Sequence, residues 1–398
     1  MKFNRMKLLK VVFGAYFLTL VALFFYSFTQ VDLSLTLTKT TLLQAILSKL
    51  QYFGFYQRPI SAVVFITISL LLFVFYVYFL SIAKKITPNK LFILIGITFI
   101  SLVFSYNAFS YDLFNYIFDA KILTFYHQNP YLFKPLDFAS DPMLSFMRWT
   151  HRLYPYGPSW LLFTAPLSFI GSNVFLLTFF MFKILIGLAF LGSSLLIYKI
   201  SEFIDSENKI FNTIFWSFNP LIIIEGLVSA HNDFALVFFS MLAFYLYLQK
   251  KKFFSFLALL FSIGVKYLSF ILIPIFGYLI YLEKRGKKIQ WDKIILASVV
   301  FSLISLAAVT YRTTFQPWYL IFPLSLAALI AKKYFIIIPA FVASLFMIFI
   351  YTFYVLLTDY SPNYPQVILN VETIGLFATI ASPLIYLILN NPFSRFIE

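Results

Sequence analysis

The chain has 398 residues, of which 62% are hydrophobic, 22% are aromatic and only 11% are charged. A water-soluble domain of this length could not cover its surface with so few polar side chains, so a lipid bilayer must be its solvent. Cysteine is absent, which excludes disulfides and thiolate metal sites. The excess of Lys and Arg gives a formal net charge of +15, which raises the question of a nucleic-acid partner.

Apolar stretches of helical length recur along the chain and predict its architecture. A helix needs ~20 apolar residues to cross the hydrocarbon core, and these stretches show no strand alternation. We therefore predict an all-α polytopic membrane protein of about twelve spans, forming a single integral membrane domain over residues 1–398. The amphipathic stretch 42–53 is expected to lie in the membrane interface. The predicted spans are 8–28, 60–82, 91–106, 174–198, 210–229, 234–249, 253–265, 267–282, 294–311, 317–331, 334–357 and 368–389.

The basic residues indicate the topology. With the N-terminus in the cytoplasm, most basic clusters fall in cytoplasmic connections, from Lys84 and Lys85 to Lys332 and Lys333. This asymmetry follows the positive-inside rule, so the net charge requires no nucleic-acid partner and favours anionic membrane lipids instead. We predict a multi-pass protein of the cytoplasmic membrane, with both termini cytoplasmic and an extracytoplasmic active site.

The segment 107–173 is the longest polar interruption of the apolar series, and we expect it to be an extracytoplasmic catalytic loop containing interfacial helices. Helical periodicity covers 111–126, whereas 159–170 is apolar but too short to span comfortably, which favours a helix in the outer leaflet. Asp112 and Asp119 stand two turns apart on one face of the first helix, about 10 Å along its axis.

Further polar residues gather in other turns predicted on the outer side. The cations expected to hold an anionic ligand are Lys266, Arg312, Arg152 and Arg148. The polar and aromatic residues expected on the same face, which could bind a ligand there, are His231, Asn232, Asp233, Glu225, Tyr156, Gln316, Trp318 and Tyr319. Glu225 is predicted one turn inside the membrane, where a carboxylate is usually functional or paired. Lys183 and Glu372 could pair with each other or with Glu225.

Each of these residues also has a structural interpretation. Asp112 and Asp233 could cap the helices that follow them. Lys266 and Arg312 could extend to lipid headgroups, and Trp318 could belong to an aromatic belt. Their collection on one face is more specific than any single residue.

Transfer of a sugar from a lipid phosphate needs this combination of groups. A base must deprotonate the acceptor hydroxyl, and cations must hold the departing phosphate, whose charge grows in the transition state. An external carboxylate such as Asp112, together with Lys and Arg, supplies both. Fixed cations can substitute for a divalent metal, so the sequence requires no cofactor, although the external acids could bind a cation. No GxGxxG or Walker pattern supports nucleotide chemistry on the cytoplasmic face.

Several short motifs resemble those of GT-C fold glycosyltransferases. The segment from Asp112 to Tyr131 is similar to their first external loop, and the other motifs follow in the family's order to about Leu329. The closest resemblance is to polyprenol-phosphate-mannose-dependent α-1,6-mannosyltransferases and related lipid-glycan mannosyltransferases. The other motifs are Tyr156-Gly157-Pro158-Ser159-Trp160, the stretch from Phe218 to Gly226, Ala230-His231-Asn232-Asp233, Val265-Lys266-Tyr267 and Gln316-Pro317-Trp318-Tyr319.

The resemblance implies an inverting hexosyltransferase, with mannose as the sugar and a polyprenyl-phosphate sugar as the donor. The acceptor would be a glycan or glycolipid on the extracytoplasmic face. The family's catalytic aspartate corresponds to Asp112, but the loop is one residue longer than the usual pattern, so Asp119 stays an alternative. The resemblance also places His231 to Asp233 at the sugar site and Lys266 near the lipid phosphate.

Two other classes of function compete with the transferase. A transporter or flippase of lipid-linked saccharides would need ionisable residues along a transmembrane path and related halves. Here those residues cluster at one surface and no internal repeat is evident. A non-catalytic scaffold would leave the external acid–base cluster unexplained. Within the enzyme class, a transferase using a diphosphate donor is a further alternative.

Overall fold

The computed structural model describes residues 2–311, 314–358 and 361–389, and these residues form helices, turns and loops without a strand. The all-helical prediction is therefore confirmed for the described part of the chain. Seven helices there are long and apolar enough to cross a membrane, as an integral membrane protein requires. They lie in α1 (Lys2–Ser27), α3 (Arg58–Ser81), α7 (Phe175–Ile204), α12 (Leu272–Lys284) with the turn before it, α13 (Trp291–Thr310), α15 (Tyr334–Leu357) and α16 (Tyr364–Leu389).

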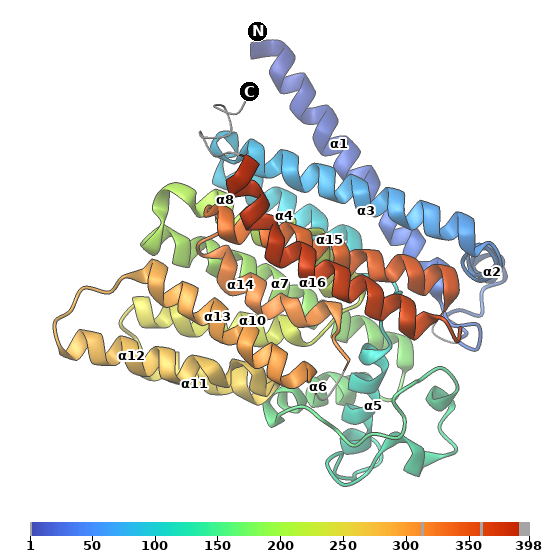
Figure 1. Ribbon diagram of the computed structural model, residues 1–398. Coiled ribbons are helices and arrows are strands. Elements are labelled where there is room, and N and C mark those ends of the chain that lie inside the picture. Colours follow the sequence, from blue (N-terminus) through green and yellow to red (C-terminus); the bar gives the residue numbers. More distant parts are fainter. Residues whose placement is uncertain (1, 312–313, 359–360, 390–398) are drawn as a thin grey trace.

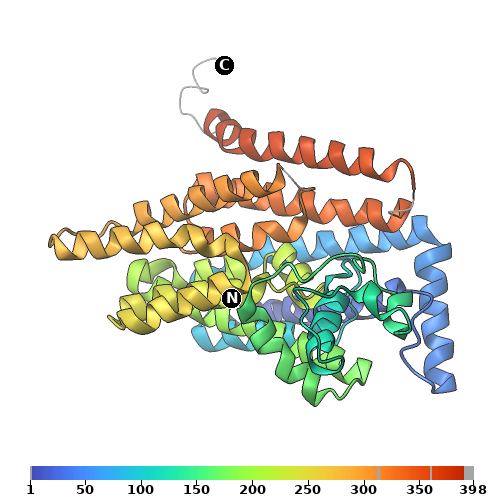
Figure 2. The ribbon, with the colours of Figure 1, turned by 90° about the horizontal axis from the view of Figure 1, so that it is seen from below.

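The remaining predicted spans correspond to shorter or broken helices, so the count of about twelve spans stays a prediction. The short apolar helices are α4 (Pro88–Leu102), α10 (Asp233–Leu248), α11 (Lys252–Val265) and α14 (Ile321–Ala328), which follows the turn Pro317–Leu320. In Figure 1 these helices run beside the long ones in one bundle. In the middle of the chain α10 packs between α7 and α11, while α15 packs against α3 and α16. Figure 2 shows α16 at the outer edge of the bundle.

The span predicted at 210–229 is broken. It consists of α8 (Lys209–Ser217), a bend of 54°, α9 (Pro220–Ile223) and one π-helical turn, Ile224–Val228. The break has a local cause, because a proline lacks the N–H of a helix interior and disfavours helical geometry in the residue before it. The Asn219 side chain then accepts a hydrogen bond from the Leu221 N–H (2.9 Å) and starts the second helix.

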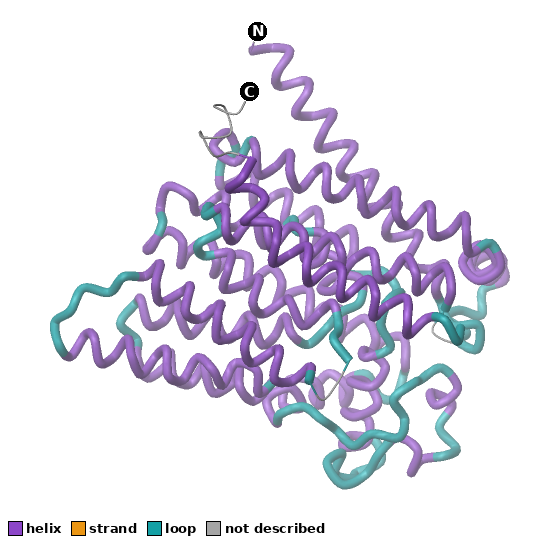
Figure 3. Tube along the Cα trace, in the orientation of Figure 1, coloured by secondary structure: helices purple, strands orange, loops and turns teal. Residues whose placement is uncertain are grey.

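The predicted extracytoplasmic loop forms one end of the molecule. It contains α5 (Asp112–Thr124) and α6 (Pro158–Ile170), close to the predicted helices, and the longest run of loop in Figure 3 lies between them. The start of α1 and the end of α16 lie at the opposite end of the bundle (Figure 1). A further helix, α2 (Thr41–Tyr56), runs across the direction of the long helices in Figure 2. That orientation is expected of an interfacial helix, although its position in a membrane stays a prediction.

Candidate active site

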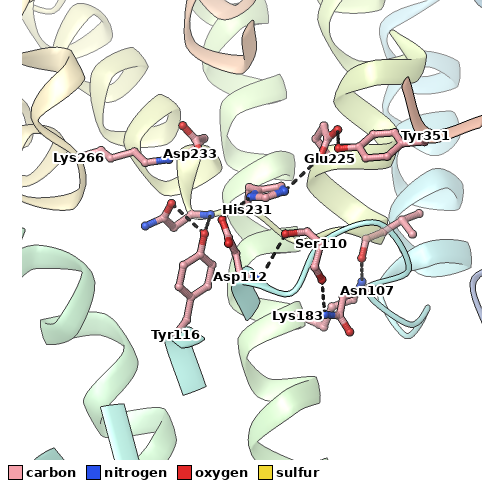
Figure 4. Close-up of polar contacts among 12 residues, drawn as sticks. Asn107, Ser110, Asp112, Tyr116, Lys183, Glu225, His231, Asp233, Lys266 and Tyr351 are labelled. Atoms are coloured by element: carbon pink, nitrogen blue, oxygen red, sulfur yellow. Dashed lines mark hydrogen bonds and ion pairs between the residues drawn. The ribbon is translucent and has the colours of Figure 1, made fainter. Parts of the chain in front are cut away.

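A tight turn presents Asp112 at the start of α5. The Asn107 side-chain amide donates to the Ser110 carbonyl (2.8 Å), and the Ser110 hydroxyl accepts a hydrogen bond from the Asp112 N–H (3.2 Å). Tyr111, which precedes α5, makes no side-chain capping bond. The Asp112 carboxylate points toward His231, as Figure 4 shows. Its side chain keeps 14% of its surface exposed.

His231 lies between two carboxyl groups. Its Nδ1 is 3.5 Å from Oδ2 of Asp112, and its Nε2 is 3.2 Å from Oε2 of Glu225. On the far side, the Tyr351 hydroxyl donates to Oε1 of Glu225 (2.5 Å). The His231 and Glu225 side chains are fully buried, whereas Asp112 is partly exposed. Asp112, His231, Glu225 and Tyr351, which we call the His231 array, thus lead from the surface of the site into its interior (Figure 4).

The surroundings of His231 fix the position of its imidazole ring and raise its pKa. Its ring stacks on Trp318, with the centroids 4.1 Å apart and the planes 16° apart. Burial alone would lower the pKa of His231, but the hydrogen bonds and charges of Asp112 and Glu225 outweigh it and raise the pKa to about 9. At neutral pH His231 is therefore an imidazolium between two carboxyl groups.

Lys183 forms hydrogen bonds with the backbone between Glu225 and His231. The π-helical turn ends at Val228, so the carbonyls of its last residues lack the partners that a continuing helix would supply. The Lys183 ammonium donates to the carbonyls of Leu227 and Val228 (2.8 Å to the latter) and to the Ser105 hydroxyl (3.2 Å). An ammonium has three N–H donors, and three oxygens receive them.

The pairing of Lys183 with Glu225, considered from the sequence, is wrong. The partners of Glu225 are His231 and Tyr351, and Lys183 binds backbone carbonyls instead. The difference arises because the π-helical turn places the carbonyl groups, and not the carboxylate, over α7. Tyr351 itself was not predicted, since α15 contains no charged or amide side chain that would mark a site there.

A second ion pair lies beside the His231 array. Oδ2 of Asp233 is 2.6 Å from the Lys266 ammonium, and α10, which starts at Asp233, has no side-chain cap. The Tyr116 hydroxyl donates to Oδ1 of Asn232 (3.2 Å). Burial, followed by the nearby Tyr156 and the charges of Asp112 and Asp233, raises the pKa of Tyr116 well above its usual value. Tyr116 is thus a neutral phenol that lies between Asp112 and the Asp233–Lys266 ion pair (Figure 4).

Lys266 lies beside two aromatic rings, and its side chain is partly exposed. Its ammonium lies 5.9 Å from the ring of Tyr156 and 5.8 Å from that of Tyr319. A close approach of two glycines positions these groups, because a Cβ on Gly157 would lie 2.3 Å from the carbonyl oxygen of Gly264. The Gly157 N–H also donates to the Val265 carbonyl (3.3 Å), next to Lys266.

The second aspartate of α5 has different surroundings. Asp119 retains 3% of its surface and makes no hydrogen bond or ion pair within the described parts of the chain. Burial, together with the charge of Asp112, raises the pKa of Asp119 well above its usual value. The surroundings of Asp119 therefore favour the protonated form of its carboxyl group more than ordinary solvent does.

The other predicted site residues lie at the edges of this cluster or outside the described residues. The Arg148 guanidinium stacks over Tyr111 at 4.2 Å, and that of Arg152 over Trp149 at 4.3 Å. The Gln316 amide donates to the Thr314 hydroxyl (3.1 Å). Arg312 lies outside the described residues. The structure therefore joins His231, Asn232, Asp233, Glu225, Lys266, Tyr156, Trp318 and Tyr319 with Asp112, and leaves the two described arginines on neighbouring aromatic rings.

No group of three or more His, Asp or Glu side chains that could hold a metal ion occurs among residues 2–311, 314–358 and 361–389.

Residues 12–282 match the family model for the N-terminal domain of alpha-(1->6)-mannopyranosyltransferases. Comparisons with curated proteins and with solved structures give no match. Since the matched region covers more than half of the 398 residues, the chain belongs to the alpha-(1->6)-mannopyranosyltransferase family and is a membrane mannosyltransferase.

Proposed function

We propose that the protein transfers mannose from a polyprenyl-phosphate-mannose donor to a hydroxyl of a glycan or glycolipid, on the extracytoplasmic face and with inversion at the sugar carbon. The observation that carries the proposal is the surrounding of Asp112. This carboxylate is partly exposed and lies 3.5 Å from Nδ1 of the buried His231. A general base needs both access to the substrate proton and a fixed orientation.

The reaction follows from these positions. The acceptor hydroxyl gives its proton to the Asp112 carboxylate, and its oxygen attacks the anomeric carbon of mannose. The bond from that carbon to the phosphate oxygen breaks on the opposite face, and polyprenyl phosphate leaves with the bonding electron pair. Attack opposite to the leaving group inverts the configuration.

Lys266 is placed to stabilise the leaving phosphate. Its ammonium lies beside the rings of Tyr156 and Tyr319, and its side chain is partly exposed. Its pairing with Asp233 fixes the ammonium in one position and leaves N–H donors for a phosphate oxygen. Fixed donors of this kind stabilise charge that develops in the transition state.

Asp119 fits the role of base less well. A base must be ionised before the reaction, whereas burial raises the pKa of Asp119 and disfavours its ionised form. Its burial also restricts the approach of an acceptor hydroxyl. These two observations support Asp112 over Asp119.

The activity is tested with purified protein, radiolabelled polyprenyl-phosphate sugars and a panel of membrane glycolipids and oligosaccharides. We expect transfer from the mannose donor, release of polyprenyl phosphate, and an α linkage formed from a β donor. Movement of the donor across liposome membranes without any chemical change would support the flippase alternative. Transfer from a diphosphate-linked donor alone would contradict the monophosphate assignment.

The sidedness is tested separately, and the absence of native cysteine makes this direct. Gln128→Cys places a thiol on the long loop, and Lys287→Cys places one on the loop between α12 and α13, both at exposed positions. In intact cells, a membrane-impermeant maleimide should label the first variant and leave the second unlabelled until the membrane is opened. The reverse pattern would place the proposed site in the cytoplasm.

A further inference from the structure

A cavity of about 540 Å³ opens beside the last turns of α5, away from the residues assigned to the transfer reaction. Its position along the helix follows from the chain, because Lys121 comes nine residues after Asp112, about 14 Å along the axis at 1.5 Å per residue. The cavity lining combines charged, hydroxyl, amide and aromatic side chains, among them Lys121, Tyr126, Asp141, Ser168, Asn173 and Phe175.

A buried ion pair lies in the wall of this cavity. The Lys121 ammonium is 2.5 Å from Oδ2 of Asp141, and both side chains are buried. The Tyr126 hydroxyl donates to the same oxygen (2.7 Å), and the Met143 N–H donates to the other (2.9 Å). The pair has no net charge, and its hydrogen bonds hold it in one geometry. A neutral ligand with hydroxyl groups can therefore bind here without displacing a counter-ion, whereas an added phosphate would meet the Asp141 carboxylate.

The remaining lining suits a sugar. Lys121 keeps N–H donors beyond the one directed at Asp141, and the hydroxyls of Thr124 and Ser168, which share a hydrogen bond of 2.9 Å, can accept from a ligand. The rings of Phe125 and Tyr126 lie 5.4 Å and 5.7 Å from the ammonium. Polar groups beside aromatic faces match a sugar ring, which has hydroxyls at its edge and apolar C–H groups on its faces.

An apolar groove continues from the cavity. It has a volume of about 490 Å³ and runs between α5 and α6. Thr124 and Phe169 line both spaces, so the groove and the cavity are contiguous. The rest of the groove is lined by Leu123, Pro158, Leu161, Leu162, Ala165 and Pro166, which match a hydrocarbon chain.

We propose that the cavity and the groove together bind a lipid with an uncharged sugar headgroup, the sugar against Lys121 and Asp141 and the hydrocarbon chain between α5 and α6. The binding proposal stands on this geometry alone. Its biological meaning rests on the proposed function: for a mannosyltransferase the occupant is a glycolipid acceptor, anchored here while its glycan reaches toward Asp112.

Binding is measured with the purified full chain in detergent and tritiated glucosyl-dioleoylglycerol, a neutral hexose on a diacylglycerol. Unlabelled glucosyl-dioleoylglycerol, dioleoylglycerol and dioleoylphosphatidylglycerol serve as competitors. We expect the sugar lipid to compete at least about tenfold better than either of the others, the ratio that a difference of ~1.4 kcal/mol would give. Equal competition by dioleoylglycerol would overturn sugar recognition, and stronger competition by phosphatidylglycerol would overturn the neutral headgroup.

Two neighbouring residues of α6 provide a matched pair of variants. Phe169 lines both spaces and is 73% exposed, whereas Ile170 is 59% exposed and lines neither, so both should tolerate truncation. We expect Phe169→Ala to weaken binding about tenfold, since the lost apolar contact is of that order, and Ile170→Ala to bind like the wild type. Equal losses in both variants, or none in Phe169→Ala, would contradict the location.

The double variant Lys121→Met/Asp141→Leu tests the headgroup contacts without leaving one buried charge unpaired. It should lose the preference for the sugar lipid over dioleoylglycerol while keeping affinity for the chain. A retained preference would contradict the role of the ion pair. Asp112→Asn separates this proposal from the transferase proposal, because it should abolish transfer and leave glucosyl-dioleoylglycerol binding unchanged. If that variant still transfers mannose, the base assignment fails and the binding result stands.

Discussion

The first and third turns of α5 each carry an aspartate, and their surroundings are opposite. Asp112 in the first turn keeps 14% of its side chain exposed and faces His231. Asp119, two turns later, retains 3% of its surface and has no hydrogen-bond or ion-pair partner in the described part of the chain. Two identical side chains on one helix thus have different access and different partners, because the rest of the fold packs differently around each of them.

The strongest test of this contrast is Asp112→Asn. It keeps the size of the side chain and removes the proton acceptor, so we expect kcat to fall about 10³-fold, within the range contributed by general bases. The KM for the donor should change little, because Lys266 is untouched. The measurement is initial-rate kinetics of mannose transfer with labelled donor. A rate within about twofold of the wild type would remove Asp112 from the mechanism.

The second test concerns the support of Asp112. His231→Gln keeps a hydrogen-bonding group and removes the imidazolium between Asp112 and Glu225, so we expect kcat to fall about 10²-fold through loss of orientation. Tyr351→Phe, which alters only the far end of the His231 array, should cost about tenfold or less. The pH–rate profile distinguishes positioning from general destabilisation, since only the histidine variant should lose the high-pH limb. An unchanged profile would contradict the role of His231.

The third test addresses the backbone beneath the array. Lys183→Met leaves two carbonyls and a hydroxyl without their donor, and we expect a loss of stability on the order of 3 kcal/mol. Lys199→Met on the same helix is the control, because Lys199 is half-exposed and its pair with Glu202 is of the kind that contributes little. Thermal unfolding in detergent checks both. Equal losses would show that Lys183 does not hold the turn.

The fourth test uses pH. The folded pKa of His231 is about 9, above the ordinary value of 6.5, so the folded state binds a proton there more tightly than the unfolded chain. The resulting stability is complete below pH 6.5 and is lost as the pH rises to about 9. Melting temperatures of the wild type should fall across this window more than those of His231→Gln. Parallel curves would contradict the imidazolium between the two carboxyl groups.

The smallest effect is expected from Asp119→Asn. Because burial favours the neutral form of this carboxyl group, an amide of the same shape should leave transfer within about twofold of the wild type. The folded pKa is raised, so an ionisable group at this position becomes more destabilising as the pH rises. The variant should therefore melt at a higher temperature than the wild type at pH 8. A large loss of kcat would reverse the roles of the two aspartates.

Local sequence patterns predicted the bounds of the helices better than the contact partners of individual side chains. The apolar stretches predicted the bounds of α3 and α15 to within about two residues. Hydropathy predicted one span at 210–229, whereas the helix breaks at Pro220. Spacing put Asp112 and Asp119 on one helix but carried no information on burial, which depends on how α5 packs in the bundle. The acceptors of Lys183 follow from a π-helical turn in a distant segment.

The matched family region ends at residue 282, but the His231 array includes a residue from beyond that point. Trp318, which stacks on His231, and Tyr351, which binds Glu225, both come from the part of the chain beyond it. The proposed reactive center is therefore built from residues inside and outside the matched region. A chimaera that joins residues 1–282 of this chain to the C-terminal part of a relative would keep Asp112 and His231. It would work only if the new partner supplied an equivalent ring and phenol.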